Sequence, residues 1–141
     1  MRHYIVDTSV LVAGFLAQRE SSPTVRWLRI LLEGTESVVV STDLLAEYRV
    51  VLQRKAGMAT VNVEAVLEAI LSHALVLDPP PAAQAAPDPG DAHLWALLAA
   101  DPKACLVTGD SALIEGEKDG RALNPKDAMT RWLAGSASQT G

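Results

Sequence analysis

The segment His3-Tyr4-Ile5-Val6-Asp7 decides the fold, because this short aromatic and β-branched run ends on a carboxylate. Such a run is typical of a buried strand. A later segment, Cys105-Leu106-Val107-Thr108-Gly109-Asp110, has the same form and also ends on an aspartate. Between them lies a third apolar run, Ser37-Val38-Val39-Val40-Ser41. The sequence therefore predicts three buried strands, two of which carry an aspartate at their carboxyl ends.

The segments between these strands carry apolar residues at helical spacing. Helices are expected over about 10–17 after Thr8 and Ser9, from Ser22-Pro23 to Gly34, from Thr42 or Asp43 to Gly57, from Asn62 through Leu71, from Asp91 through Leu98, and over 125–133. Ala122-Leu123 is expected to form a short last strand. This alternation predicts an α/β fold, a three-layer α/β/α sandwich with a mainly parallel central sheet flanked by helices.

Length and composition indicate one globular domain. The chain has 141 residues, of which 49% are apolar and 21% charged. The Pro-rich stretch Asp78–Gly90 is expected to be a surface loop and not a linker, because the remaining residues would make a marginal second domain. We expect a single domain over 1–134 and a flexible C-terminal tail over 135–141.

Several classes of protein are excluded. Cys105 is the only cysteine, which excludes a disulfide scaffold. Asp7 interrupts the start where a signal peptide needs apolar residues, and the apolar run 10–17 is too short to cross a bilayer. We therefore expect a cytoplasmic protein without a membrane partner. A net charge of -5 also lacks the positive field of a general nucleic-acid binder, so nucleic-acid chemistry would need metal ions or a local basic patch.

The strand-end aspartates are the first candidates for a functional site. Ligands of open parallel sheets bind beyond the carboxyl ends of the strands, so Asp7 and Asp110 would share one edge if their strands are neighbours. Two close carboxylates repel each other unless a cation lies between them. Ligation by oxygen alone favours Mg²⁺ or Mn²⁺.

Other acids extend this set, and each candidate has a structural alternative. Glu47 lies at the border of the apolar face of the third predicted helix, where a glutamate usually reaches into solvent. Asp91 precedes the fifth helix and could be its N-cap. Asp7 and Asp110 could equally form turns or caps. Asp88, in Pro-Asp-Pro-Gly, is more typical of a turn residue.

Three further groups of residues carry weaker signals. The cations at the end of the Glu47 helix are candidates for contacts to RNA phosphates, although a solvated helix end favoured by the macrodipole explains them as well. The tryptophans have apolar neighbours, which favours packing over base stacking, and the histidines lack metal-ligand spacing. The cations are Arg49, Arg54 and Lys55, the tryptophans are Trp27, Trp95 and Trp132, and the histidines are His3, His73 and His93.

Five segments, taken in order, resemble the PIN domain family, in particular its small VapC-like toxin components. They are Ile5–Val12, Ser41–Tyr48, Asp88–Leu94, Val107–Leu113 and Leu123–Ala128. The first is similar to a strand ending in Asp-Thr-Asn/Ser, and the second to a segment that supplies a helical glutamate. The likeness covers about residues 2 to 134.

The resemblance implies a metal-dependent ribonuclease that hydrolyses a phosphodiester with water activated by one or two Mg²⁺ or Mn²⁺ ions. The catalytic and metal-binding acids it implies are Asp7, Glu47, Asp91 and Asp110. The supporting residues it implies are Ser9 beside the metal, Thr108 at the strand end and Asp88. Ala112 departs from the pattern, because the family often has another acid there, and this departure puts the second ion in doubt.

The resemblance further implies the toxin of a toxin–antitoxin pair, with single-stranded or structured RNA as substrate, a cognate antitoxin protein as partner, and a homodimer. One alternative is a catalytically degenerate PIN-fold binding module, favoured by Ala112 and the negative net charge. Another is a phosphohydrolase of haloacid-dehalogenase type with Asp7 as nucleophile. That chemistry wants a second aspartate where this chain has Ser9, which ranks it low.

Overall fold

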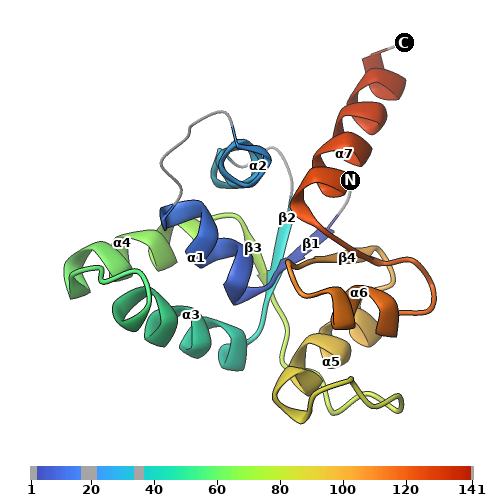
Figure 1. Ribbon diagram of the computed structural model, residues 1–141, viewed down its shortest axis with the longest axis horizontal. Helices are drawn as coiled ribbons and strands as arrows, with labels where there is room; N and C mark the ends of the chain where they lie inside the picture. The colour runs from blue at the N-terminus through green and yellow to red at the C-terminus, as the bar shows by residue number, and fades with distance from the viewer. Residues whose placement is uncertain (1–2, 17–21, 34–36, 141) are drawn as a thin grey trace.

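The fold is built on one five-stranded parallel sheet. A computed structural model describes residues 3–16, 22–33 and 37–140 (Figure 1). Neighbouring strands are all parallel, in the order β3-β2-β1-β4-β5. The strands are β1 His3–Val6, β2 Ser37–Val40, β3 Ala74–Val76, β4 Ala104–Val107 and β5 Ala122–Leu123. The predicted three-layer α/β/α sandwich is confirmed, and β3 is a further strand where the sequence showed only a short apolar stretch.

Helices cover both faces of the sheet (Figure 1). They are α1 Thr8–Leu16, α2 Pro23–Leu32, α3 Thr42–Arg54, α4 Thr60–Leu71, α5 Ala92–Ala100, α6 Ser111–Gly116 and α7 Pro125–Thr140, with a single 3₁₀ turn over Pro89–Asp91. The short helix α6 was not predicted. Within the described ranges, no helix combines the length and apolarity needed to cross a membrane.

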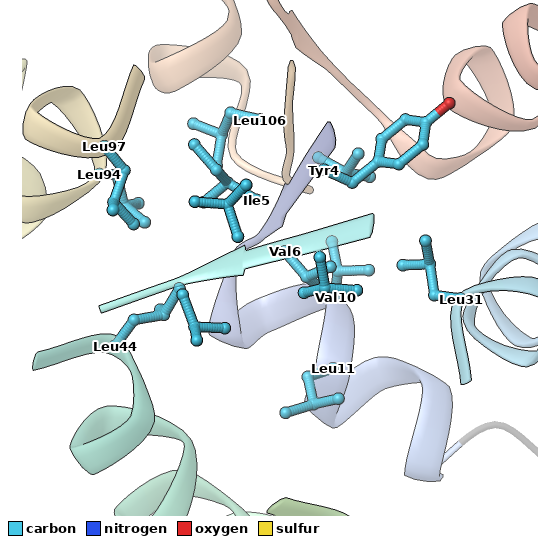
Figure 2. Packing of buried hydrophobic residues seen from close by; sticks show 14 of the residues in the cluster. Tyr4, Ile5, Val6, Val10, Leu11, Leu31, Leu44, Leu94, Leu97 and Leu106 are labelled. Atoms are coloured by element: carbon cyan, nitrogen blue, oxygen red, sulfur yellow. The ribbon is translucent and has the colours of Figure 1, made fainter. Parts of the chain in front are cut away.

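The central strand β1 divides the core into two halves. Successive side chains of a strand point to opposite faces, and Figure 2 shows Ile5 directed toward α5, whereas Val6 lies on the side of α1 and α2. All residues of β1 beyond His3 are buried. Their labelled partners are Leu94, Leu97 and Leu106 on the first side and Val10 and Leu31 on the second. Helices therefore clamp β1 from both faces, which fixes the position of the residue that follows it.

The caps of the first helices differ in part from those expected. Ser22 caps α2 as predicted, because its hydroxyl accepts from the Val25 amide at 3.2 Å. Ser41, and neither Thr42 nor Asp43, caps α3 by accepting from the Leu44 amide at 3.1 Å. Ser41 has the extended backbone that an N-cap requires, whereas Thr42 is already helical.

Other boundaries also shift. Thr8 and Ser9 lie inside the first turn of α1 instead of preceding it. Helix α4 begins at Thr60 and not at Asn62, and the Ala59 position before it provides no side-chain cap. Helix α7 continues to Thr140, past the predicted end at Leu133. The flexibility of a tail over 135–141 stays a prediction.

The Pro-rich loop is irregular as predicted until its single 3₁₀ turn. It packs against α6 at Gly116, where a Cβ atom would lie 2.7 Å from Pro87 Cγ. Such a distance is far below ordinary van der Waals contact, so only glycine lets the loop approach this closely. The 3₁₀ turn at the end of the loop leads directly into α5, so this contact helps to place the start of that helix.

Trp27 tests the packing of α2 onto the sheet. Its side chain has no exposed surface and lies edge-on to Tyr4, with ring centroids 5.2 Å apart. We expect Trp27→Ala to lower the free energy of unfolding by about 3–5 kcal/mol, measured by urea denaturation. Trp27→Phe should cost less, because the indole Nε1 is buried without a hydrogen-bond partner among the described residues.

The control is Val61→Ala on α4, where the side chain is 74% exposed. This change should shift the free energy of unfolding by no more than about 0.5 kcal/mol. Equal losses for Trp27→Ala and Val61→Ala would contradict the packing described for α2.

Candidate functional site

The candidate site lies where the order of strands in the sheet reverses. The chain adds β2 and then β3 on one side of β1, and afterwards places β4 and β5 on the other side. Crevices at such switch points, beyond the carboxyl ends of the strands, are where open parallel sheets bind ligands. Val6 pairs with Val107 in parallel register, and the next amide, that of Asp7, donates to the Val107 carbonyl at 2.9 Å. The strand-end aspartates therefore emerge at one edge, as expected.

Two hydroxyl groups hold the buried carboxylate of Asp7, and a third lies near it. Thr108 Oγ1 donates to Asp7 Oδ2 at 2.6 Å, and Ser9 Oγ donates to the same oxygen at 3.1 Å. Thr8 Oγ1 lies 3.4 Å from the other oxygen. These contacts hold the Asp7 carboxylate in a fixed orientation.

Helix α3 brings Glu47 to the same place. Thr8 Oγ1 lies 3.2 Å from Glu47 Oε1, so one hydroxyl stands between the carboxylates of Asp7 and Glu47. The next residue, Tyr48, is buried, and its hydroxyl donates to the Val6 carbonyl. Burial first, and then the charges of Asp7 and Glu47, hold the pKa of Tyr48 well above its usual value. Tyr48 therefore remains a hydrogen-bond donor and ties α3 to the end of β1.

Asp88 is a turn residue, as expected, whereas Asp91 does not act as the N-cap that its position suggests. Asp91 stands at the N-cap of α5, but its side chain makes no capping hydrogen bond. Asp88 caps the preceding turn by accepting from the Gly90 amide at 2.8 Å. Desolvation raises the pKa of Asp91, and so do the charges of the carboxylates near it. In order of effect these are Asp7, Asp88, Glu47 and Asp110.

Asp110 is both a cap and a neighbour of this cluster. Its Oδ1 accepts from the Ala112 amide at 2.9 Å and so begins α6, which is the structural alternative considered for it. Its own amide donates to Thr108 Oγ1 at 3.0 Å. The Thr108 hydroxyl thus connects the end of β4 to Asp7, which agrees with the strand-end role expected of it.

The donor set fits a divalent cation in chemistry and in charge. It consists of carboxylate oxygens, which Mg²⁺ and Mn²⁺ prefer, and a bound cation would relieve the repulsion that raises the pKa of Asp91. As the side chains stand, however, no group of three or more His, Cys, Asp or Glu residues in the described ranges could hold an ion. Asp7 is buried and held by hydroxyl groups, whereas Asp91 is half-buried and Asp110 is exposed.

His93 belongs to the site, although the sequence suggested only a structural or surface residue. Its Nε2 lies 2.9 Å from Glu47 Oε2. Its Nδ1 is buried and has no hydrogen-bond partner among the described residues. The one sequence signal is its place two residues after Asp91, in the first turn of α5. Thr8 and Tyr48 were likewise not proposed as site residues.

A cavity of about 340 Å³ adjoins the cluster. His93 lines it, together with Ala92 and Ala96 from α5 and Pro79 from the loop. None of the four acids lines this cavity, and His93, which contacts Glu47, connects its wall to the cluster.

The three basic residues predicted to contact RNA differ in their surroundings. Arg49 is paired with Glu64 on α4, with Nε to Oε1 at 2.7 Å and Nη2 to Oε2 at 3.2 Å, so a phosphate would compete with this carboxylate. Arg54 and Lys55 are exposed at the far end of α3, about two turns beyond Glu47. Their contact with RNA stays a prediction.

The other aromatic residues and histidines agree with the structural expectations. Trp27 and Trp95 are buried, and Trp132 is half-buried against the core. His3 Nδ1 lies 2.5 Å from Asp101 Oδ2, away from the acidic cluster, and His73 is exposed.

Comparisons with known proteins agree with this architecture. A family model described as PIN domain matches residues 3–112. No curated protein matches the chain in sequence. Among solved structures, the crystal structure of PAE2754 from Pyrobaculum aerophilum is similar, with a TM-score of 0.62 and 17% sequence identity over 95% of this chain and 90% of that one. At this identity, the likeness concerns the fold.

Asp91→Asn is expected to raise the melting temperature of the metal-free protein at pH 7. The pKa of Asp91 is higher in the folded than in the unfolded state. Ionising Asp91 therefore destabilises the folded state, and this effect appears as the pH rises above the usual aspartate pKa of about 3.9. The gain should stay below about 1 kcal/mol, because solvent screens a partly exposed charge. Thermal unfolding in EDTA at pH 7 and pH 4 measures it, and the difference should shrink at pH 4.

Asp78→Asn is the matched control with the opposite sign. Thr42 donates to Asp78 through its amide and its hydroxyl, both at 2.8 Å, and these hydrogen bonds lower the pKa of Asp78. A pKa that is lower in the folded than in the unfolded state stabilises the fold at pH values above the unfolded pKa, and this contribution is lost as the pH falls. Removing the charge of Asp78 should therefore lower the melting temperature at pH 7. If Asp91→Asn also melts earlier in EDTA, mutual repulsion of the carboxylates is disproved.

Thr108→Val tests the hydroxyl that joins the two strand ends. The change keeps the shape of a fully buried side chain but removes a donor to Asp7 and an acceptor for the Asp110 amide. We expect a loss of about 1–3 kcal/mol in the free energy of unfolding. Thr130→Val on α7 is the control, because that exposed hydroxyl donates only within its helix and should cost no more than about 0.5 kcal/mol. Similar losses at both positions would show that the Thr108 hydroxyl has no special role.

Proposed function

The chain belongs to the PIN domain family, whose members are generally nucleases that use divalent metal ions, and from this premise we propose that it is a metal-dependent ribonuclease. One observation carries the proposal. Asp7, Glu47 and Asp110 lie near enough to Asp91, at the switch point of the sheet, for their charges, together with that of Asp88, to raise its pKa. Acids placed to repel one another weaken a fold, so their gathering at this edge of the sheet favours a function that requires a cation.

The residues proposed to hold the ion are Asp7, Glu47, Asp91 and Asp110. Bound there, Mg²⁺ or Mn²⁺ would supply Lewis acidity and lower the pKa of a water molecule. The hydroxyls of Thr108 and Ser9 hold the Asp7 carboxylate in a fixed orientation. The acidic cluster repels a phosphodiester until its charge is compensated, so substrate binding at this edge should depend on the metal.

The finer assignment is the toxin of a toxin–antitoxin pair, a VapC-like ribonuclease acting on single-stranded or structured RNA in the cytoplasm. It is supported by the five sequence segments that resemble such proteins. On this proposal, the partners are RNA, a cognate antitoxin protein and a second copy of the chain. Arg54 and Lys55 are exposed cations that RNA phosphates could reach.

A second candidate is a catalytically degenerate binding module. It is favoured by the absence, within the described ranges, of three side chains placed to hold one ion. It is also favoured by Ala112, which provides no carboxylate at the start of α6. This candidate predicts RNA or protein binding that neither requires Mn²⁺ nor leads to cleavage.

Asp7→Asn tests the proposed nuclease. With Mn²⁺ and a mixed pool of single-stranded RNA, we expect the wild type to cut and the variant to lose at least about 100-fold in rate, because a ligand charge at the centre of the cluster disappears. Gel analysis of the products, with and without EDTA, gives the readout.

Asp119→Asn is the matched control, since Asp119 is an exposed residue in the turn that precedes β5. It should cut as fast as the wild type. Circular dichroism must show that both variants fold. Cleavage by Asp7→Asn at the wild-type rate would rule out the proposed site, and RNA binding without cleavage by any of the three proteins would favour the binding module.

A further inference from the structure

Glu47 makes close contacts through both of its carboxylate oxygens. Thr8 Oγ1 lies 3.2 Å from Oε1, and His93 Nε2 lies 2.9 Å from Oε2. The Glu47 side chain is 37% exposed, whereas that of His93 is only 18% exposed. A partly exposed glutamate on a helix would ordinarily sample several rotamers in solvent. Here one contact comes from α1 and the other from α5, so two separate elements restrict its carboxylate.

The packing of α5 fixes the position of His93. It lies in the first turn of α5, and the next residue, Leu94, is buried in the core against the sheet. Helices α3 and α5 pack against each other, which brings His93 to Glu47 across a wide separation in sequence. The imidazole therefore approaches the carboxylate from a rigid element of the fold.

The two ring nitrogens of His93 have different surroundings. Nδ1 is buried with no hydrogen-bond partner among the described residues, so a proton placed there would lack an acceptor. Nε2 has the Glu47 carboxylate within hydrogen-bonding distance. We therefore assign the ring N–H to Nε2, where it faces the Glu47 carboxylate.

We propose that His93 is a positioning residue that holds Glu47 in the orientation in which it serves the acidic cluster. This inference rests on the proposed function, since it takes Glu47 to be a ligand of the ion. Carboxylate ligands are commonly oriented by hydrogen bonds from outside the ligand set, and losing such a partner typically costs 10–100-fold in metal affinity. His93 would therefore raise the affinity for the ion without binding it.

The test compares Mn²⁺ binding, measured by titration calorimetry at one pH, for the wild type, His93→Leu and His93→Gln. His93→Leu removes the donor and should weaken binding by about 10–100-fold. His93→Gln keeps an N–H group at a similar reach from the backbone and should recover most of that loss. His73→Leu is the matched control, because His73 is exposed, and it should bind like the wild type.

A separate stability measurement distinguishes a local from a global effect. The melting temperatures of His93→Leu and His93→Gln in EDTA should agree within a few degrees, although their Mn²⁺ affinities differ. If His93→Leu does not fold, His93→Met takes its place, since methionine also lacks the donor but adapts to irregular space.

Each outcome decides a different claim. If the wild type does not bind Mn²⁺, the proposed function fails and this inference fails with it. If the wild type binds and His93→Leu binds equally well, the positioning role is overturned while the proposed function stands. Tighter binding by His93→Leu would show that the histidine competes with the ion. Equal weakening in the leucine and glutamine variants would show that the donor is not what matters.

Discussion

The parallel pairing of β1 with β4 is the constraint on which the site depends. It sets Val6 beside Val107, so the next residues, Asp7 and Thr108, meet through a hydrogen bond of 2.6 Å at the edge of the sheet. Packing on both faces of β1 keeps this edge in place, because Ile5 and Val6 are buried on opposite sides (Figure 2). Helices α3 and α5 then bring further acids to a point that the two strands have already fixed.

The acidic edge combines repulsion with restraint. The pKa of Asp91 is raised by burial and by neighbouring carboxylates, so without a cation the cluster opposes folding. Asp7 and Glu47 are nevertheless held by hydroxyl groups and by His93. The chain belongs to the PIN domain family. Carboxylates that are held in place, with a negative charge that no cation balances, suit a nuclease of this family.

Much of the fold, and the position of Asp7 and Asp110 at one edge of the sheet, could be predicted from the sequence, because strand-end aspartates and helical periodicity are local patterns. Long-range contacts could not be predicted in this way. Thr8 was expected to be a cap, yet its hydroxyl reaches Glu47 on another helix. His93 has no metal-ligand spacing, and only the packing of α5 against α3 reveals its contact with Glu47. For Asp91 the local rule predicts an N-cap, whereas its tertiary surroundings leave the carboxylate without a capping bond.

The most direct measurement is anomalous diffraction from crystals grown with Mn²⁺. We expect an ion at the switch point of the sheet, bound by Asp7 together with Asp91 or Glu47, with the Asp91 and Asp110 side chains turned toward it. Closure by these two acids is expected because the hydrogen bonds from Thr108 and Ser9 already hold Asp7 in place. A crystal saturated with Mn²⁺ that shows no ion at Asp7, or an ion only at a distant surface, would contradict the proposed metal site.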